Sequence, residues 1–240
     1  PGFVFLGGDE DEPMWVGREQ DGGCARNSVF MDEDRILTYD EHYIGQPGAD
    51  ANEYMAEFIQ DKGWADKRLG VELDAGPLTH NGYLSLKSRL PEATFVDAGI
   101  MVNHLRGIKS PQELEYMRQA GIISDLAMRK AIEVIQEGVH QYDAAAEIAA
   151  VLVRGNGEFG SDASVGMPQM PTGRRTSAPH LSWTDARYKP GDATNLEIGG
   201  SRFRYHTGLS RTVVVGQPDE KLAREVPIVA EAMTKTLDQT

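Results

Sequence analysis

The feature that most constrains the fold is a change of sequence pattern near residue 104. Before it, the apolar runs "FVFLGG", "PMWVG", "RILTY", "RLGVELD" and "ATFVDAG" alternate with stretches that carry apolar residues at helical spacing. This alternation is typical of an α/β domain and predicts strands at the runs, with helices over residues 51–64 and 78–91. The acidic turn at residues 9–12 is expected to join the first two strands in a hairpin.

After that point the chain predicts two helices. Ser110 is a suitable N-cap, Pro111 fits the first helical position, and Glu113 completes a capping box. A long helix should therefore run from there toward Gly138. We expect its buried face to carry Leu114, Met117, Ala120, Ala127, Ala131 and Ile135. A second helix is expected over residues 142–155.

The rest of the chain reads as a loop, strands and a last helix. Residues 155–193 are rich in Gly and Pro, which predicts a surface or active-site loop. Three antiparallel strands should follow, at "TNLEIGG", "RFRYH" and "LSRTVVVG", with Gly199 and Gly200 in the first turn. A terminal helix should begin near Asp219, and Pro227 should kink it or delay its start. We predict two domains, residues 1–104 and 105–240.

Composition narrows the class of protein. The 37 acidic residues against 24 basic ones give a net charge of -13, which disfavours nucleic acid as a partner. Cys24 is the single cysteine, so neither an intrachain disulfide nor a thiolate metal cluster is expected. The sequence has no long apolar run and no signal peptide, and we therefore expect a cytoplasmic protein with no membrane partner. Because the chain starts without Met and ends in a charged helical stretch, we expect it to be a fragment.

The ordered motifs carry a family resemblance. The segment "RGIKSPQELEYMRQA", two helices, a "PH" loop, "KPGD" and the strand "LSRT" resemble the creatinase and prolidase superfamily, the pita-bread fold. The resemblance implies a creatinase-type N-terminal α/β domain over residues 1–104. It also implies the first half of an α+β pita-bread catalytic domain over residues 105–240, with both domains truncated. A homodimer is implied as well, in which one subunit's N-terminal domain closes over its neighbour's pocket.

The resemblance also bears on metals. In metal-dependent members the last hairpin carries two aspartates that bind a divalent metal pair. Counting back from Arg211 and Thr212 puts Glu197 at the first of these positions and Gly208 at the second. Glycine has no donor atom in a side chain, and a two-metal site needs several hard oxygen ligands. We therefore expect no metal and no other cofactor.

The implied function is metal-independent hydrolysis. Creatinase has the same fold without the metal ligands and uses a loop histidine, a position that His180 matches, 17 residues before Glu197. The segments "LEIGGSRFRYHTGLSRTVVVGQP", "SAPHLSW" and "DEHYIGQ" most resemble the ectoine hydrolases. The resemblance implies C–N hydrolysis of a small cyclic amidine such as ectoine or hydroxyectoine. Glu197, in a water-poor cavity, would be nucleophile or base and His180 the proton-transfer group. Equally, Glu197 is compatible with a half-exposed strand carboxylate and His180 with a loop histidine bound to a carbonyl.

Four further residues are candidate substrate contacts. His206 lies next to the emptied metal position, and Tyr205 precedes it; the alternatives are a solvated His206 and a core Tyr205. Trp183 offers an aromatic face for a delocalised cation or simply packs in the core. Arg175 has the geometry to bind a carboxylate bidentately, or it belongs to a solvated loop.

Other functions stay open at this point. One is a Xaa-Pro peptidase-like or creatinase-like hydrolase, and another is a catalytically inactive pita-bread binding protein. Since half of the catalytic domain is expected to be missing, we predict that the chain as it stands is inactive.

Overall fold

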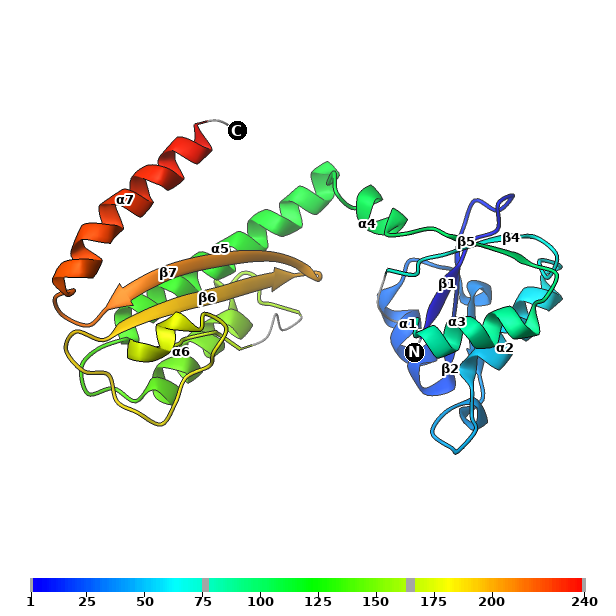
Figure 1. Ribbon diagram of the computed structural model, residues 1–240, viewed down its shortest axis with the longest axis horizontal. Coiled ribbons are helices and arrows are strands. Elements are labelled where there is room, and N and C mark those ends of the chain that lie inside the picture. The colour runs from blue at the N-terminus through cyan, green and yellow to red at the C-terminus, as the bar shows by residue number, and fades with distance from the viewer. Residues whose placement is uncertain (1, 75–77, 163–166, 239–240) are drawn as a thin grey trace. The chain divides into compact units, whose positions relative to one another are not determined.

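The computed structural model describes residues 2–74, 78–162 and 167–238. The chain divides into two compact units, Pro1–Ile108 and Lys109–Thr240 (Figure 1). The expected boundary between residues 104 and 105 lies inside the short helix α4 (Met101–Leu105), which belongs to the first unit.

The first unit has the predicted α/β pattern. Its strands are β1 (Phe3–Phe5), β2 (Met14–Arg18), β3 (Ile36–Tyr39), β4 (Arg68–Val71) and β5 (Thr94–Asp97). β2 pairs antiparallel with β1 and parallel with β3, and β4 and β5 form a separate parallel pair. Its longer helices are α1 (Glu19–Ser28), α2 (Ala51–Asp61) and α3 (His80–Arg89), and short 3-10 helices lie at Glu33–Arg35 and Glu41–Tyr43. The five predicted strands, the hairpin and two of these helices are thus confirmed.

Helix α1 is the longest element of this unit that the sequence did not predict. It contains Gly22 and Gly23, which lower helix propensity. Gly22 and Ala25 are nevertheless buried against the sheet. A methyl group on Gly22 would lie 2.7 Å from Cγ2 of Thr38 on β3, so the helix packs closer to the strand than a larger residue would permit. Tertiary packing outweighs propensity here.

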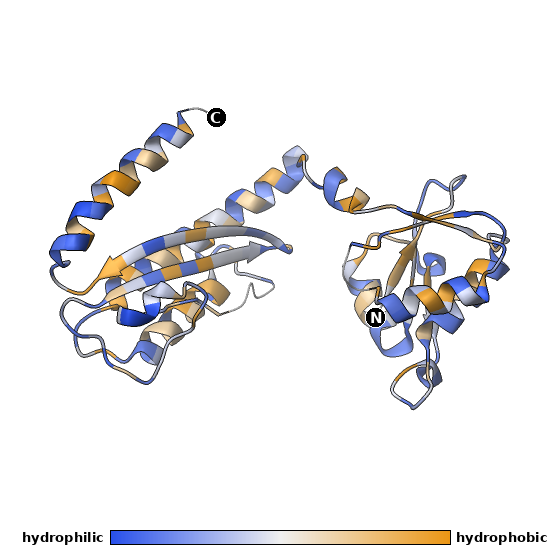
Figure 2. Ribbon diagram, in the orientation of Figure 1, coloured by the Kyte–Doolittle hydropathy of each residue, from blue (hydrophilic) through white to orange (hydrophobic). Residues whose placement is uncertain are grey.

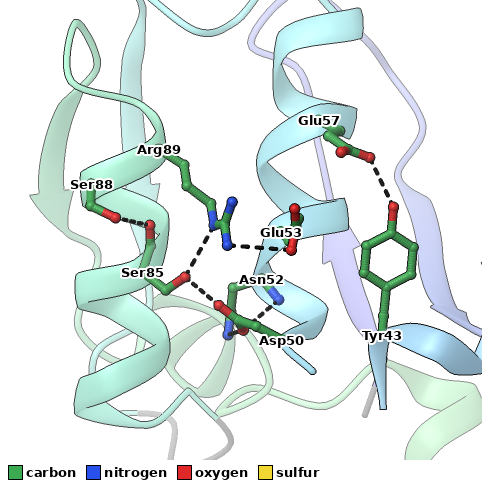
Figure 3. Close-up of polar contacts among 8 residues, drawn as sticks. All are labelled: Tyr43, Asp50, Asn52, Glu53, Glu57, Ser85, Ser88 and Arg89. Carbon is green, nitrogen blue, oxygen red and sulfur yellow. Dashed lines mark hydrogen bonds and ion pairs between the residues drawn. The ribbon is translucent and has the colours of Figure 1, made fainter. Parts of the chain in front are cut away.

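Polar contacts join α2 to α3 in the first unit (Figure 3). Asp50 caps α2 by accepting a hydrogen bond from the backbone N–H of Asn52 at 3.0 Å, and it also accepts one from the Ser85 hydroxyl on α3. Arg89 on α3 donates to Glu53 on α2 at 3.3 Å. These contacts border a hydrophobic core that includes Met55 and Leu86.

The second unit has a two-stranded sheet, one face of which packs against two helices. It comprises α5 (Pro111–Val134), α6 (Gln141–Arg154), the 3-10 helix η3 (Gly173–Ser177), β6 (Ala193–Arg202), β7 (Tyr205–Val214) and α7 (Glu220–Leu237). Helix α5 packs against both strands and against α6 (Figure 1). Figure 2 shows apolar residues alternating with polar ones along β6 and β7, as expected for a sheet with one buried face.

The start of α5 follows the prediction. Ser110 is the N-cap, Pro111 is the first helical residue, and the reciprocal capping box with Glu113 is formed. Ala120, Ala127 and Ala131 are buried as expected. Leu114 is wrong as a core residue, because it is 41% exposed and the buried residues of the helix begin at Ala120.

The hairpin was predicted with its turn in the wrong place. β6 runs unbroken through Gly199 and Gly200, and the turn lies at Phe203 and Arg204, whose φ angles are +47° and +64°. Two positive φ angles in a two-residue loop match the right-handed twist of the strands. Gly200 is instead required by packing, since a methyl group there would lie 2.4 Å from the backbone oxygen of Ala120 on α5. The expected three strands are therefore two.

Part of the segment over residues 155–193 is paired with the sheet and buried, which the sequence did not predict. Gln169 pairs antiparallel with Glu197 and Thr172 with Thr194, so part of the segment extends the sheet beside β6. Met170, which lies between them, is fully buried. The predicted surface or active-site loop is therefore in part a third extended segment of the sheet.

Helix α7 starts where the sequence predicts. Asp219 caps it by accepting from the backbone N–H of Leu222 at 2.8 Å, and Pro227 lies inside an unbroken helix. The delayed start expected from Pro227 is wrong, because the cap at Asp219 determines the first turn. Within the described residues, no helix is both long and apolar enough to span a membrane.

Candidate active site

Strand β6 presents Glu197 on the face of the sheet opposite the helices. Its neighbours Leu196 and Ile198 are 0% and 2% exposed and belong to the core. Because side chains alternate along a strand, Glu197 points to the other face, which we call the open face. The alternation predicted for these three residues is confirmed.

The loop after η3 brings His180 to Glu197. His180 Nε2 lies 3.6 Å from Glu197 Oε2, which is ion-pair distance but longer than a hydrogen bond. The loop is held beside β6 by two contacts. The backbone N–H of Met170 donates to Leu181 O at 3.0 Å, and Arg175 donates to Ser182 O at 3.4 Å. Residues that are 17 positions apart in the sequence therefore meet on the open face.

Both groups of this pair are exposed to solvent. The side chains of His180 and Glu197 are 73% and 54% exposed. The water-poor cavity expected around Glu197 is therefore wrong for these residues. The physical reason is that the open face is covered only in part by the described residues, whereas its other face is packed on α5.

Two of the four candidate substrate contacts lie away from this pair. His206 is opposite Ser201, whereas Glu197 is opposite Ser210, so four residues of strand separate them, roughly 13 Å. Tyr205 donates its hydroxyl to Glu113 Oε1 on α5 at 2.9 Å, and that contact draws it to the start of the helix. The structure does not bring these two residues to Glu197.

The other two candidates have mainly packing contacts. Trp183 is half-buried against the core of the second unit. Arg175 is exposed, and its guanidinium binds the backbone of the loop that carries His180. Arg175 thus helps to hold the loop that carries His180. This contact with a backbone oxygen differs from the carboxylate contact that the sequence suggested.

A metal site would need several donor side chains close together. Within the described part of the chain, no three His, Cys, Asp or Glu side chains come together in a way that could hold an ion. Gly208 lies on the open face opposite Gly199, two residue pairs along the hairpin from Glu197, and a methyl group there would meet nothing within 4 Å. Position 208 therefore offers no side-chain ligand atom. The described residues do not fit a two-metal site.

Two neighbours of Glu197 were missed by the sequence reasoning. Ser210 lies directly opposite Glu197 on β7, and Gln169 lies opposite it on the other side. With the hairpin turn placed at residues 203 and 204, simple counting would have found Ser210. No pattern in "GMPQMPTG" signals that Gln169 pairs with β6.

The chain matches two family descriptions along its length. Residues 115–240 match metallopeptidase family M24, and residues 2–108 match the creatinase/prolidase N-terminal domain. The chain therefore belongs to the creatinase/prolidase superfamily, with a creatinase-type N-terminal domain and part of a pita-bread domain.

Individual relatives agree with this family. The chain is 38% identical to ectoine hydrolase of Halomonas elongata over 237 residues, which cover 96% of this chain and 59% of that protein. It is 28% identical to Xaa-Pro dipeptidase of Pyrococcus furiosus over 170 residues, or 71% of this chain and 47% of that protein. The chain thus spans about three fifths or less of these relatives.

A solved structure shares the fold. X-Pro aminopeptidase from Thermotoga maritima superposes with a TM-score of 0.78 over 96% of this chain and 58% of that one, at 17% sequence identity. At that identity the likeness concerns the fold.

Proposed function

We propose that the full-length protein is a metal-independent hydrolase that opens a small cyclic amidine, with ectoine or hydroxyectoine as the expected substrate. The observation that carries the proposal is the approach of His180 to Glu197 at 3.6 Å, on a face where Gly208 offers no ligand atom. The 38% identity to an ectoine hydrolase supports the choice of substrate.

The chemistry follows from the two side chains. The amidinium carbon is electron-poor, and the Glu197 carboxylate either attacks it or takes a proton from a water that attacks it. The ring C–N bond then breaks, and the leaving nitrogen receives a proton from His180. If the carboxylate itself attacks, a water then cleaves the bond between Glu197 and the former amidine carbon. Either route consumes one water, and the ring opens to an amide and a free amine. His180 Nε2 lies 3.6 Å from Glu197 Oε2, which supports the assignment of both groups to one bound ring.

The variants Glu197→Gln and His180→Ala test these roles in the full-length protein. We expect kcat for ectoine, followed by NMR, to fall about 10²- to 10⁴-fold in each variant. Glu225→Gln on the exposed surface of α7 is the matched control and should keep wild-type kcat. Turnover that survives both substitutions would reject the assigned roles.

A second candidate is a Xaa-Pro peptidase. The 28% identity to a Xaa-Pro dipeptidase and the match to a metallopeptidase family favour it. The same assay with an Ala-Pro dipeptide separates the two, because a peptidase would hydrolyse the dipeptide and leave ectoine intact. Turnover of neither compound would favour a binding protein without activity.

A further inference from the structure

We infer that Gln169 and Ser210 bind the N–H groups of the amidinium substrate on either side of Glu197. This inference rests on the proposed function and adds residues that orient the amidinium group over Glu197.

The first step is the position of Gln169. Its backbone N–H donates to Glu197 O, and the N–H of Glu197 donates to Gln169 O, both at 3.0 Å. In an antiparallel pair of this kind the two Cα atoms lie about 5.5 Å apart, and both side chains point to the same face. Met170 next to it is fully buried in the core with Leu196 and Ile198, which places Gln169 on the open face.

The second step is the row of side chains across the sheet on either side of Glu197. Ser210 is opposite Glu197 on β7, so its side chain also belongs to the open face. Three neighbouring strands therefore present Gln169, Glu197 and Ser210 side by side across the sheet. The central group is the carboxylate, and an oxygen acceptor lies on each side of it.

The third step is the state of the Gln169 amide. Its Oε1 is buried and has no hydrogen-bond partner. A buried acceptor without a donor costs free energy, and such groups call for a reason. The terminal torsion of a glutamine is broad, so the carbonyl can turn toward an arriving donor at little cost.

The fourth step is the match to a ligand. An amidinium carries its N–H donors on both sides of the electrophilic carbon. With that carbon at Glu197, one N–H faces Gln169 Oε1 and the other faces Ser210 Oγ.

The variants Gln169→Met and Ser210→Ala test this arrangement in the full-length protein, with ectoine as the probe. We expect KM to rise about ten- to hundredfold for Gln169→Met and a few-fold for Ser210→Ala. Because Gln169→Met removes an unsatisfied buried acceptor and keeps the volume, Tm should stay the same or rise. A merely structural glutamine would lower Tm and leave KM unchanged. Gln217→Met, in an exposed turn, is the control.

The outcomes separate this inference from the proposed function. Wild-type turnover of ectoine with an unchanged KM in both variants would overturn the inference and leave the proposed function intact. Hydrolysis of Ala-Pro without turnover of ectoine would reject the proposed function, and with it an amidinium site.

Discussion

Two glycines on β6 and β7 differ in what a methyl group would meet. At Gly200 it would lie 2.4 Å from Ala120 O and 2.8 Å from the backbone N of Ser124, both on α5. At Gly208 it would meet nothing within 4 Å. The first glycine therefore permits the helix to approach the sheet, and the second leaves space on the open face.

This difference predicts unequal effects of the two Gly→Ala substitutions on stability. Gly200→Ala should lower the free energy of unfolding by about 2 kcal/mol, because the backbone of α5 must move to accept the methyl group. Gly208→Ala should change it by no more than about 0.5 kcal/mol. Urea unfolding of the two variants measures this, and equal losses would contradict the assigned packing.

At the scale of single residues, the sequence predicted part of the candidate site. The alternation of Leu196, Glu197 and Ile198 follows from strand periodicity and is confirmed. The approach of His180 could only be suggested, since loop length does not determine where a loop folds. The exposure of both groups could not be predicted, because it depends on what covers the open face.

The capping box at the start of α5 is tied to the hairpin through Glu113. Its carboxylate accepts from the backbone N–H of Ser110 at 2.7 Å and from the Tyr205 hydroxyl at 2.9 Å. The bond from the Ser110 backbone, followed by the contacts with the Ser110 and Tyr205 side chains, lowers the pKa of Glu113 below its ordinary value of 4.5. One side chain therefore fastens the helix start to β7.

This lowered pKa gives a pH dependence with a definite sign. The Glu113 contribution is fully present above about pH 4.5, the unfolded value, and is lost as pH falls through the lower folded pKa. Glu113→Gln keeps a capping acceptor but removes the titration. We expect Tm of this variant to fall less steeply than wild-type Tm below pH 4.5.

Thermal melts between about pH 5 and pH 3 measure this slope. Glu115→Gln, two residues further along the helix surface, is the control and should follow the wild type. If Glu113→Gln also followed the wild-type slope, the carboxylate contacts to Ser110 and Tyr205 would not persist in solution.

Elements with local signals were predicted best. The capping box at Ser110 and the helix start near Asp219 are confirmed. In both places the N-cap side chain accepts a hydrogen bond from a helix N–H group. The turn at Phe203 and Arg204 was missed because neither residue favours positive φ. Helix α1 was missed because Gly22 serves a packing contact with Thr38 that no local pattern records.

At the scale of the whole molecule, the change of pattern near residue 104 was the most informative signal. Each of the two units has its own hydrophobic core, one that includes Met55 and one that includes Leu196. The pairing of Gln169 with β6 lay beyond sequence reasoning, since it depends on the path of a long connection. The chain spans 59% of the ectoine hydrolase that it resembles, so the activity proposed here belongs to the full-length protein.

The central claim is hydrolysis of an amidine without a metal, by Glu197 and His180. Dialysis of the full-length protein against EDTA, followed by metal analysis and an NMR assay with ectoine, tests it most directly. We predict far less than one equivalent of metal per subunit and undiminished turnover. About two equivalents of tightly bound manganese, zinc or iron, with turnover abolished by EDTA and restored by the metal, would contradict it.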